Sequence, residues 1–190
     1  DSDFDTAGIP VMLQGFRQVD NQQKVGQICP AVSYLHESGR VACNIKGFKP
    51  VDWAISSGSL VDVDIGLSIG GFDDFYFIDR VDADFCWLLK KQSFSTLICN
   101  EVTMPHCLGT LGRFGSYQHS AIRHYYRSRN RVYFNFKHFG YLKAFSFSLV
   151  GAVKQVVIII IYEDKAWSKL KYLVRGVMDS IKKTSGGKYY

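Results

Sequence analysis

Residues 144–162, AFSFSLVGAVKQVVIIIIY, are a long apolar run that strongly restricts how this chain can fold. The run approaches the length of a membrane-spanning helix, so it must be covered by protein or by lipid. Lys154 and Gln155 lie inside the run, and a charge in the middle of a bilayer is costly. We therefore expect a helix that packs on the protein or lies at a membrane interface, and not a span.

The charges are divided unevenly along the chain. Residues 1–112 contain 8 Lys and Arg against 14 Asp and Glu, a balance of −6, whereas residues 113–190 contain 15 against 3, a balance of +12. An acidic part suits a metal site or simple solvation, and a basic part suits phosphate, anionic lipid or nucleic acid. The division predicts two working parts, residues 1–112 and residues 113–190.

Length and composition indicate a globular protein without a disulfide framework. With 190 residues and 47% hydrophobic content, the chain can bury a sizeable core. The five cysteines form no CxxC pair, which favours a reducing compartment. The chain begins with acidic residues and has neither an initiating Met nor an apolar signal segment there, so we expect a processed product or a part of a longer protein.

Residues 1–112 have the patterns of a mixed α/β fold. Apolar runs with β-branched residues between Gly and Asp predict short strands, and acids early with lysines late predict a helix. A helix followed by a strand would return the chain from Asp82 to the same edge of the sheet at His106. The expected strands are Val25–Tyr34, Val51–Ile55 and Phe94–Cys99, and the expected helices are Asp64–Ile69, ended by Gly70 and Gly71, and one that begins at Asp79.

Residues 113–190 have helical patterns throughout. Helices are expected over residues 121–137, 144–162 and about 165–183, the first with arginines at a spacing of four. Eleven Phe and Tyr lie between Phe114 and Phe147. Basic residues among aromatic ones could bind single-stranded nucleic acid, lie on an anionic membrane, or pack as ordinary helices with solvated charges.

Several polar residues could carry chemistry, although each also has an ordinary structural explanation. Asp-x-Asp pairs are common in turns, and acids at a helix N-terminus stabilise its dipole. A Ser-Gly-Ser tripeptide is typical of a tight turn, a lone His is more often structural, and Trp usually packs in a core. The residues are Asp1 and Asp3, Ser57, Gly58 and Ser59, Asp79, Asp82 and Asp84, His106, and Trp53 and Trp87.

In this order the motifs resemble the later part of the catalytic domain of family 2 glycosyltransferases, in particular the bacterial rhamnosyltransferase-like branch. The likeness includes Arg129-Asn130, which is similar to a pattern that recurs after the catalytic domain in that branch. The resemblance implies a partial GT-A-like mixed sheet, in the α/β class, followed by C-terminal helices. The N-terminal nucleotide-binding half of the family is missing, so it also implies that this chain alone is inactive.

The resemblance assigns roles to individual residues. Asp82 matches the catalytic base, although Val81 replaces the acid that often precedes it. A divalent metal, Mg or Mn, would be held by Asp1, Asp3 and His106. The resemblance, together with the chemistry of the side chains, implies a substrate-binding set of Ser57, Gly58, Ser59, Asp79, Asp84 and Trp87.

The implied reaction is inverting transfer of a sugar, for example rhamnose, from a nucleotide-sugar to a surface polysaccharide or lipid-linked acceptor. Residues 1–112 would form the metal- and acceptor-binding part, and residues 113–190 a membrane-associated part. The expected location is the cytoplasm, peripheral on the inner face of the cell membrane, with an anionic membrane surface rather than nucleic acid as partner. The competing hypothesis is a non-catalytic basic module that binds anionic membrane or nucleic acid.

Overall fold

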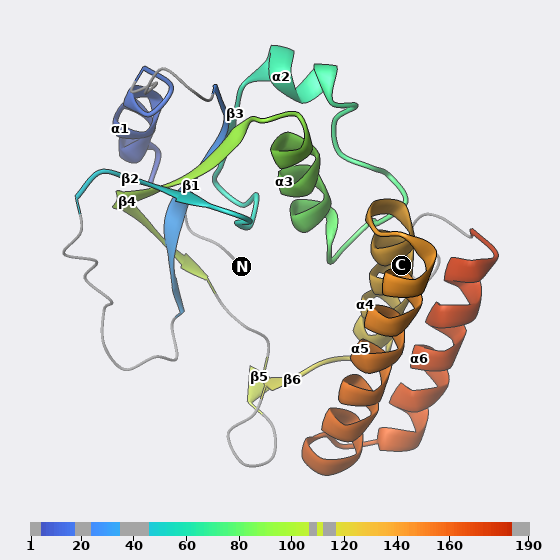
Figure 1. Ribbon diagram of the computed structural model, residues 1–190. Helices are drawn as coiled ribbons and strands as arrows, with labels where there is room; N and C mark the ends of the chain where they lie inside the picture. Colours follow the sequence, from blue (N-terminus) through green and yellow to red (C-terminus); the bar gives the residue numbers. More distant parts are fainter. Residues whose placement is uncertain (1–4, 18–23, 35–45, 107–109, 112–116, 184–190) are drawn as a thin grey trace. The chain divides into compact units, whose positions relative to one another are not determined.

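The computed structural model describes residues 5–17, 24–34, 46–106, 110–111 and 117–183, and Figure 1 shows the path of the chain. The chain forms two compact units. The first comprises the described residues of Asp1–Asp73 and Asp82–Leu108, and the second those of Asp74–Val81 and Gly109–Tyr190. The segment 74–81 therefore packs with the C-terminal helices. The predicted working parts, 1–112 and 113–190, stay a prediction about function.

The first unit is built on a four-stranded mixed sheet with the order β2-β4-β1-β3. The strands β1 and β4 are parallel, β2 is antiparallel to β4, and β3 is antiparallel to β1. This confirms the mixed α/β class. The strands are β1 (Val25–Tyr34), β2 (Phe48–Val51), β3 (Leu60–Val61) and β4 (Ser95–His106).

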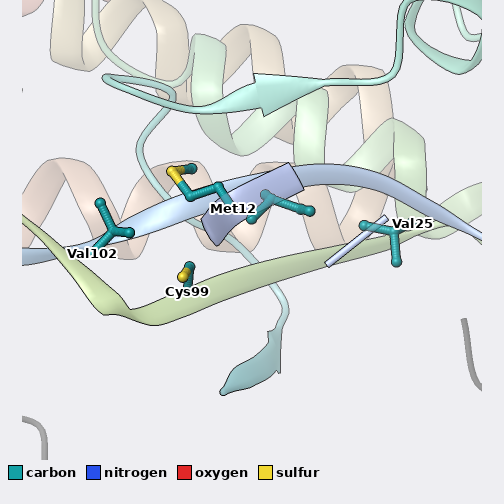
Figure 2. Packing of buried hydrophobic residues seen from close by; sticks show 5 residues of the cluster. Met12, Val25, Cys99 and Val102 are labelled. Atoms are coloured by element: carbon teal, nitrogen blue, oxygen red, sulfur yellow. The ribbon is translucent and has the colours of Figure 1, made fainter. Parts of the chain in front are cut away.

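Helices cover both faces of this sheet. On one face, α1 (Ile9–Gln14) places Met12 in the core with Ile28 of β1 (Figure 2). The preceding residue of the strand, Gln27, accepts a hydrogen bond from the Cys86 thiol of α3 (Val81–Lys91). Because neighbouring residues of a strand point to opposite faces, α3 lies on the other face. Its close approach requires Gly26, where a Cβ would lie 2.5 Å from Leu89.

Several expected elements have different bounds, among them the helix expected from Asp79, which is α3 and begins only at Val81 because Asp79 and Arg80 have positive φ values. The strand expected at Val51–Ile55 was wrong, because β2 ends at Val51 and residues 52–55 are irregular. The strand expected at Phe94–Cys99 is β4, which continues to His106 after an irregularity in its pairing with β1. The helix expected before the paired glycines is confirmed as α2 (Val63–Ser68), which Asp62 caps.

The second unit contains three long helices that lie side by side (Figure 1). They are α4 (Ala121–His138), α5 (Tyr141–Tyr162) and α6 (Ala166–Ile181), as the patterns predicted, and a short hairpin of β5 (Thr110–Leu111) and β6 (Tyr117–Gln118) precedes them. The helices α4 and α6 meet at Gly176, where a Cβ would lie 2.2 Å from the Ser128 hydroxyl.

The three helices bury polar side chains and expose apolar ones. Tyr125 donates a hydrogen bond to Asp179 at 2.9 Å, and the Asn135 amide donates to the Ser148 hydroxyl at 3.0 Å. The outer side of α5 exposes Leu142, Leu149, Val150, Val153, Val157, Ile160 and Ile161. The helices also bury apolar residues such as Phe134, Ile159 and Leu173, but polar pairs inside together with a large apolar surface on α5 are unusual for a water-soluble bundle.

Candidate active site

Asp82 is held by Ser56 in the first unit. The Ser56 N–H donates to Asp82 Oδ1 at 3.0 Å, and the Ser56 hydroxyl donates to the same oxygen. Among the described residues, Asp82 Oδ2 has no hydrogen-bond partner, and the side chain is only partly buried. One carboxylate oxygen is therefore fixed, while the other is free to accept a proton from a bound molecule.

The Ser-Gly-Ser tripeptide forms a tight turn directly after Ser56. The Ser59 N–H donates to the Ser56 carbonyl at 3.0 Å, and Gly58 has a φ of +66°, which favours glycine. The Ser59 hydroxyl accepts from the Gln27 amide at 3.2 Å, so the turn is tied to the central strand β1. The structure therefore brings Ser57, Gly58 and Ser59 next to the residue that holds Asp82.

Two buried cysteines, Cys29 and Cys86, lie near Asp82. The Cys86 thiol donates to Gln27 Oε1 at 3.4 Å and to the Ala54 carbonyl at 3.7 Å. Burial raises the pKa of Cys29 and of Cys86, and the charge of Asp82 adds to both shifts. Both thiols are therefore protonated and have a structural role.

The remaining residues of the predicted substrate set are less accessible. Asp84 is buried, with 1% of its surface exposed, and two residues along a helix place it about 200° around α3 from Asp82. Trp87 is partly buried on the side of α3 away from Asp82. Trp53, in contrast, is 59% exposed and lies three residues before Ser56, where an aromatic ring could stack on a sugar.

Asp79 belongs to the second unit, where it faces Arg123 of α4. Asp79 Oδ1 lies 3.5 Å from Arg123 Nη2. Asp79 therefore has a cationic partner on α4, and its role in substrate binding stays a prediction.

The segment before α3 is held by two residues of α4. Arg129, which is fully buried, donates to the carbonyls of Phe75 at 2.6 Å and Tyr76 at 2.9 Å. Asn130 donates to the carbonyls of Tyr76 and Asp79, each at 2.9 Å, and also contacts that of Ile78. We call Arg129 and Asn130 the backbone clamp.

The backbone clamp acts on an unusual stretch of chain. Phe77, Asp79 and Arg80 have φ values of 61°, 59° and 69°, which non-glycine residues rarely adopt. Such a conformation persists only where its surroundings hold it, and here the hydrogen bonds to the carbonyls of Tyr76, Ile78 and Asp79 do so. Sequence reasoning recognised Arg129-Asn130 as a family pattern but did not reveal this contact.

The predicted metal ligands lie largely outside the described residues. Asp1 and Asp3 are not among them, and only the backbone of His106, at the end of β4 opposite Tyr34, is described. Within the described part of the chain, no group of three His, Cys, Asp or Glu side chains could hold a metal ion. The described side chains do not fit a metal site, and the Mg or Mn site stays a prediction.

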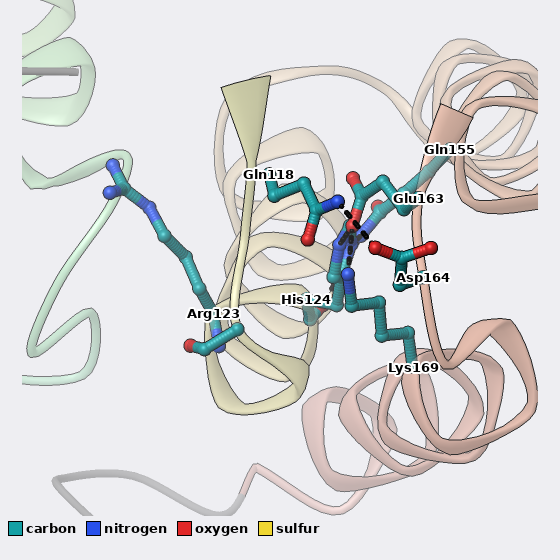
Figure 3. A network of polar contacts seen from close by, with 8 residues as sticks. Gln118, Arg123, His124, Gln155, Glu163, Asp164 and Lys169 are labelled. Atoms are coloured by element: carbon teal, nitrogen blue, oxygen red, sulfur yellow. Dashed lines mark hydrogen bonds and ion pairs between the residues drawn. The ribbon is translucent and has the colours of Figure 1, made fainter. Parts of the chain in front are cut away.

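A buried polar network joins the three helices of the second unit (Figure 3). His124 Nε2 lies 2.8 Å from Glu163, whose same oxygen accepts from Lys169 at 2.7 Å. The Gln155 amide lies 2.9 Å from His124 Nδ1. Burial lowers the pKa of His124; burial would raise that of Glu163, but hydrogen bonds from Lys169 and His124 lower it.

This network predicts that the second unit loses stability in acid. Burial, with Arg127 and Arg123 nearby, also lowers the pKa of His119 to about 4. Histidines of the unfolded chain bind protons below about pH 6.5, whereas His119 and His124 of the native protein do so only at lower pH. The free energy of unfolding should therefore decrease as the pH falls below about 6.5. Native Glu163 keeps its charge below the ordinary pKa, so its contribution disappears at still lower pH. Urea unfolding at pH 7.5, 5.5 and 4.5 measures this, and equal midpoints would contradict it.

Comparison with known proteins finds a distant similarity to a protein described as a sugar transferase. The dTDP-rhamnosyl transferase RfbF of Shigella flexneri is 26% identical to this chain over 147 residues. The match covers 72% of this chain and 47% of that protein, so the chain spans about half the length of its curated relative. No family model and no solved structure matches. The chain is therefore distantly similar to part of a protein described as a rhamnosyl transferase.

Proposed function

We propose that this chain contains the acceptor side of an inverting glycosyltransferase active site, with Asp82 as the general base. The observation that carries the proposal is the state of the Asp82 carboxylate, with one oxygen held by Ser56 and the other free. The motif order and the distant rhamnosyltransferase relative support a nucleotide-sugar donor and a glycan acceptor.

In the proposed reaction, Asp82 Oδ2 accepts the proton of an acceptor hydroxyl. The hydroxyl oxygen attacks the anomeric carbon of the donor, and the bond from that carbon to the diphosphate oxygen breaks. The nucleoside diphosphate leaves, and the sugar is transferred with inversion. Ser56 fixes the direction in which Asp82 presents its free oxygen, which is the contribution of a positioning residue.

The turn after Ser56 and the exposed Trp53 would hold the acceptor. Gly58 lets the backbone approach a sugar closely, and the Ser57 hydroxyl can bond to it. Trp53 offers an exposed ring on the same connection between β2 and β3. Rhamnose as the sugar and a lipid-linked or surface polysaccharide as the acceptor remain part of this proposal.

The experiment is a transfer assay on the native full-length protein with a panel of dTDP-, UDP- and GDP-sugars, with and without Mg or Mn. We expect release of nucleoside diphosphate with at least one donor, stimulated by an acceptor glycan. The dTDP-rhamnose arm tests the sugar, and the metal arm tests the role proposed for Asp1, Asp3 and His106. Absence of transfer from every donor in the presence of metal and acceptor would contradict the proposal.

We further propose that the second unit attaches to the inner face of the cell membrane. By length and composition α5 could cross a bilayer, with 22 residues and a mean hydropathy of 2.1 in its best window. However, α5 is bound along its length to α4, through Ser148 and Gln155, and α4 carries five Arg and Lys. A spanning α5 would draw those charges into hydrocarbon, so the exposed apolar side favours an interfacial position.

This attachment predicts a specific loss of vesicle binding. Replacing Val153 and Ile160, both exposed on α5, by Asp should reduce binding to vesicles of anionic phosphatidylglycerol by about tenfold or more, because two charges would enter the interface. Leu13→Asp, at an exposed position of the first unit, is the matched control and should have little effect. Co-sedimentation measures binding. Undiminished vesicle binding by the double variant would contradict the interfacial position. Native protein that stays on the vesicles after alkaline washing would contradict it as well.

The non-catalytic alternative would give a different result. A basic module for nucleic acid would bind single strands with an affinity that falls steeply with salt, and it would transfer no sugar. The exposed surface of α5 is apolar rather than basic, which favours a membrane over nucleic acid as the partner.

A further inference from the structure

Three arginines gather on one side of the second unit, and within the described part of the chain no carboxylate forms an ion pair with any of them. Arg127 and Arg131 are four residues apart on α4 and therefore share a face, and Arg80 lies against Phe134 of the same helix, with its guanidinium carbon 5.3 Å from the ring centre. The nearby carboxylate of Asp79 forms an ion pair with Arg123 and also stabilises the charge of the adjacent Arg80. Like charges so placed repel one another in the free protein.

Arg131 is incompletely satisfied as well. Its Nε and Nη2 atoms are buried, and within the described part of the chain neither has a hydrogen-bond partner. Burial, together with the charges of Arg80 and Arg127, lowers the pKa of Arg131 to about 10. Buried guanidinium groups in proteins normally have partners, and these two donors remain available to an acceptor from outside the described residues.

The neighbouring Arg129 shows what a structural arginine looks like in this helix. Arg129 donates to the carbonyls of Phe75 and Tyr76 and to the side chain of Asn130, at 2.6–2.9 Å. Arg129 therefore uses its hydrogen-bond donors inside the protein. In contrast, Nε and Nη2 of Arg131, two residues further along the helix, have no acceptor among the described residues.

The helix α5 forms the other side of the cluster. Arg131 crosses α5 at Gly151, where a Cβ would lie 2.6 Å from its Cδ, so this side chain needs a glycine there. The helices are antiparallel, with Asn135 bonded to Ser148 and His124 to Gln155. The crossing of Arg131 and Gly151 lies between these two pairs of residues.

We propose that Arg80, Arg127 and Arg131 form a binding site for the diphosphate group of a lipid-linked acceptor. Guanidinium groups match phosphate oxygens with paired hydrogen bonds, and two phosphates would neutralise the cluster. The exposed apolar side of α5 continues from this cluster, so a lipid chain attached to the diphosphate can lie along it. The identity of this ligand as an acceptor rests on the proposed function.

The test is a binding measurement that needs no transfer. Native protein is titrated with neutral phosphatidylcholine vesicles that contain either a prenyl diphosphate or phosphatidylglycerol at equal total charge, and separately with inorganic pyrophosphate. We expect binding to the prenyl diphosphate vesicles to be about tenfold tighter or more than to phosphatidylglycerol, because paired hydrogen bonds add to charge. Weaker binding to pyrophosphate alone is expected. Equal affinity for the two kinds of vesicle would overturn the proposal. An affinity for pyrophosphate as high as that for the prenyl diphosphate would show that the site binds a free phosphate compound and not a lipid.

Variants separate this site from general attraction between charges. The double variant Arg127→Gln, Arg131→Gln should lose the preference for the prenyl diphosphate, whereas Lys171→Gln, Lys182→Gln on and after α6 removes equal charge and should keep it. Gly151→Leu, which changes no charge, should displace Arg131 and also reduce the preference. Equal losses in the two double variants would overturn the proposal. Diphosphate binding without any transfer would instead contradict the proposed function and leave this site standing.

Discussion

Replacing Asp82 by Asn should lower turnover of the proposed glycosyltransferase reaction by about 100-fold or more, while donor binding stays nearly unchanged. The amide retains an oxygen that can accept from Ser56, so the local fold should persist, but it cannot take the proton of the acceptor hydroxyl. Steady-state kinetics on the native full-length protein, with donor affinity measured separately, give the two quantities.

The Ser56→Ala variant provides a graded control for the same site. It removes the hydroxyl that bonds to Asp82 Oδ1 and keeps the backbone N–H at 3.0 Å, so the carboxylate is held less firmly. We expect turnover to fall by about tenfold or less, without the loss of the base itself. Turnover of Asp82→Asn above that of Ser56→Ala would show that Asp82 is not the base.

Replacing Arg129 by Met should destabilise the second unit by about 3 kcal/mol or more. The variant leaves the carbonyls of Phe75 and Tyr76 without their donor, and hydrogen bonds to a charged group contribute about 1.5–3 kcal/mol each. It also removes the guanidinium that lies 4.8 Å from the centre of the Phe75 ring. Urea unfolding, with hydrogen exchange over residues 75–79, measures the loss.

The matched control for this prediction is Arg127→Met. Arg127 is partly exposed on the same helix and has no hydrogen bond to the backbone among the described residues, so its replacement should change stability by about 1 kcal/mol or less. Equal effects of the two substitutions would mean that the backbone clamp contributes little to holding residues 75–79.

The helices of this chain could be predicted from sequence because their signals are local. The paired glycines after α2 have φ values of 94° and 69°, as a helix end requires, and the acids and lysines of α3 lie at the ends that favour them. The helices α4, α5 and α6 lie within a few residues of the ranges expected for them. Local signals also placed the Ser-Gly-Ser turn, whose Gly58 adopts a positive φ.

Contacts between distant residues could not be predicted in this way. The strand expected at Val51–Ile55 failed because pairing with β4 uses Phe48–Val51, and the partner strand decides which residues pair. Ser56 is an ordinary serine in sequence, and only the fold brings it to Asp82, 26 residues away. The backbone clamp likewise joins residues more than 50 positions apart.

The exposed apolar surface and the buried polar pairs of the second unit could be predicted only in part from the sequence. The run 144–162 was expected to lie at an interface or to pack on the protein, and the packing on α4 is present. Ser148 and Gln155, the polar side chains that bind α5 to α4, lie within an otherwise apolar segment. Their partners Asn135 and His124 come from another helix, and apolar periodicity alone does not reveal such pairs.

The most direct test of the account compares three carboxylates in one assay. Asp79→Asn, Asp82→Asn and Asp84→Asn are each measured for turnover with saturating donor and acceptor, and for folding by circular dichroism. We expect all three to fold and only Asp82→Asn to lose about 100-fold or more in turnover, because Asp82 alone presents a free oxygen beside the Ser-Gly-Ser turn. A folded Asp82→Asn protein with near-native turnover, and a loss in Asp79→Asn or Asp84→Asn instead, would contradict the account.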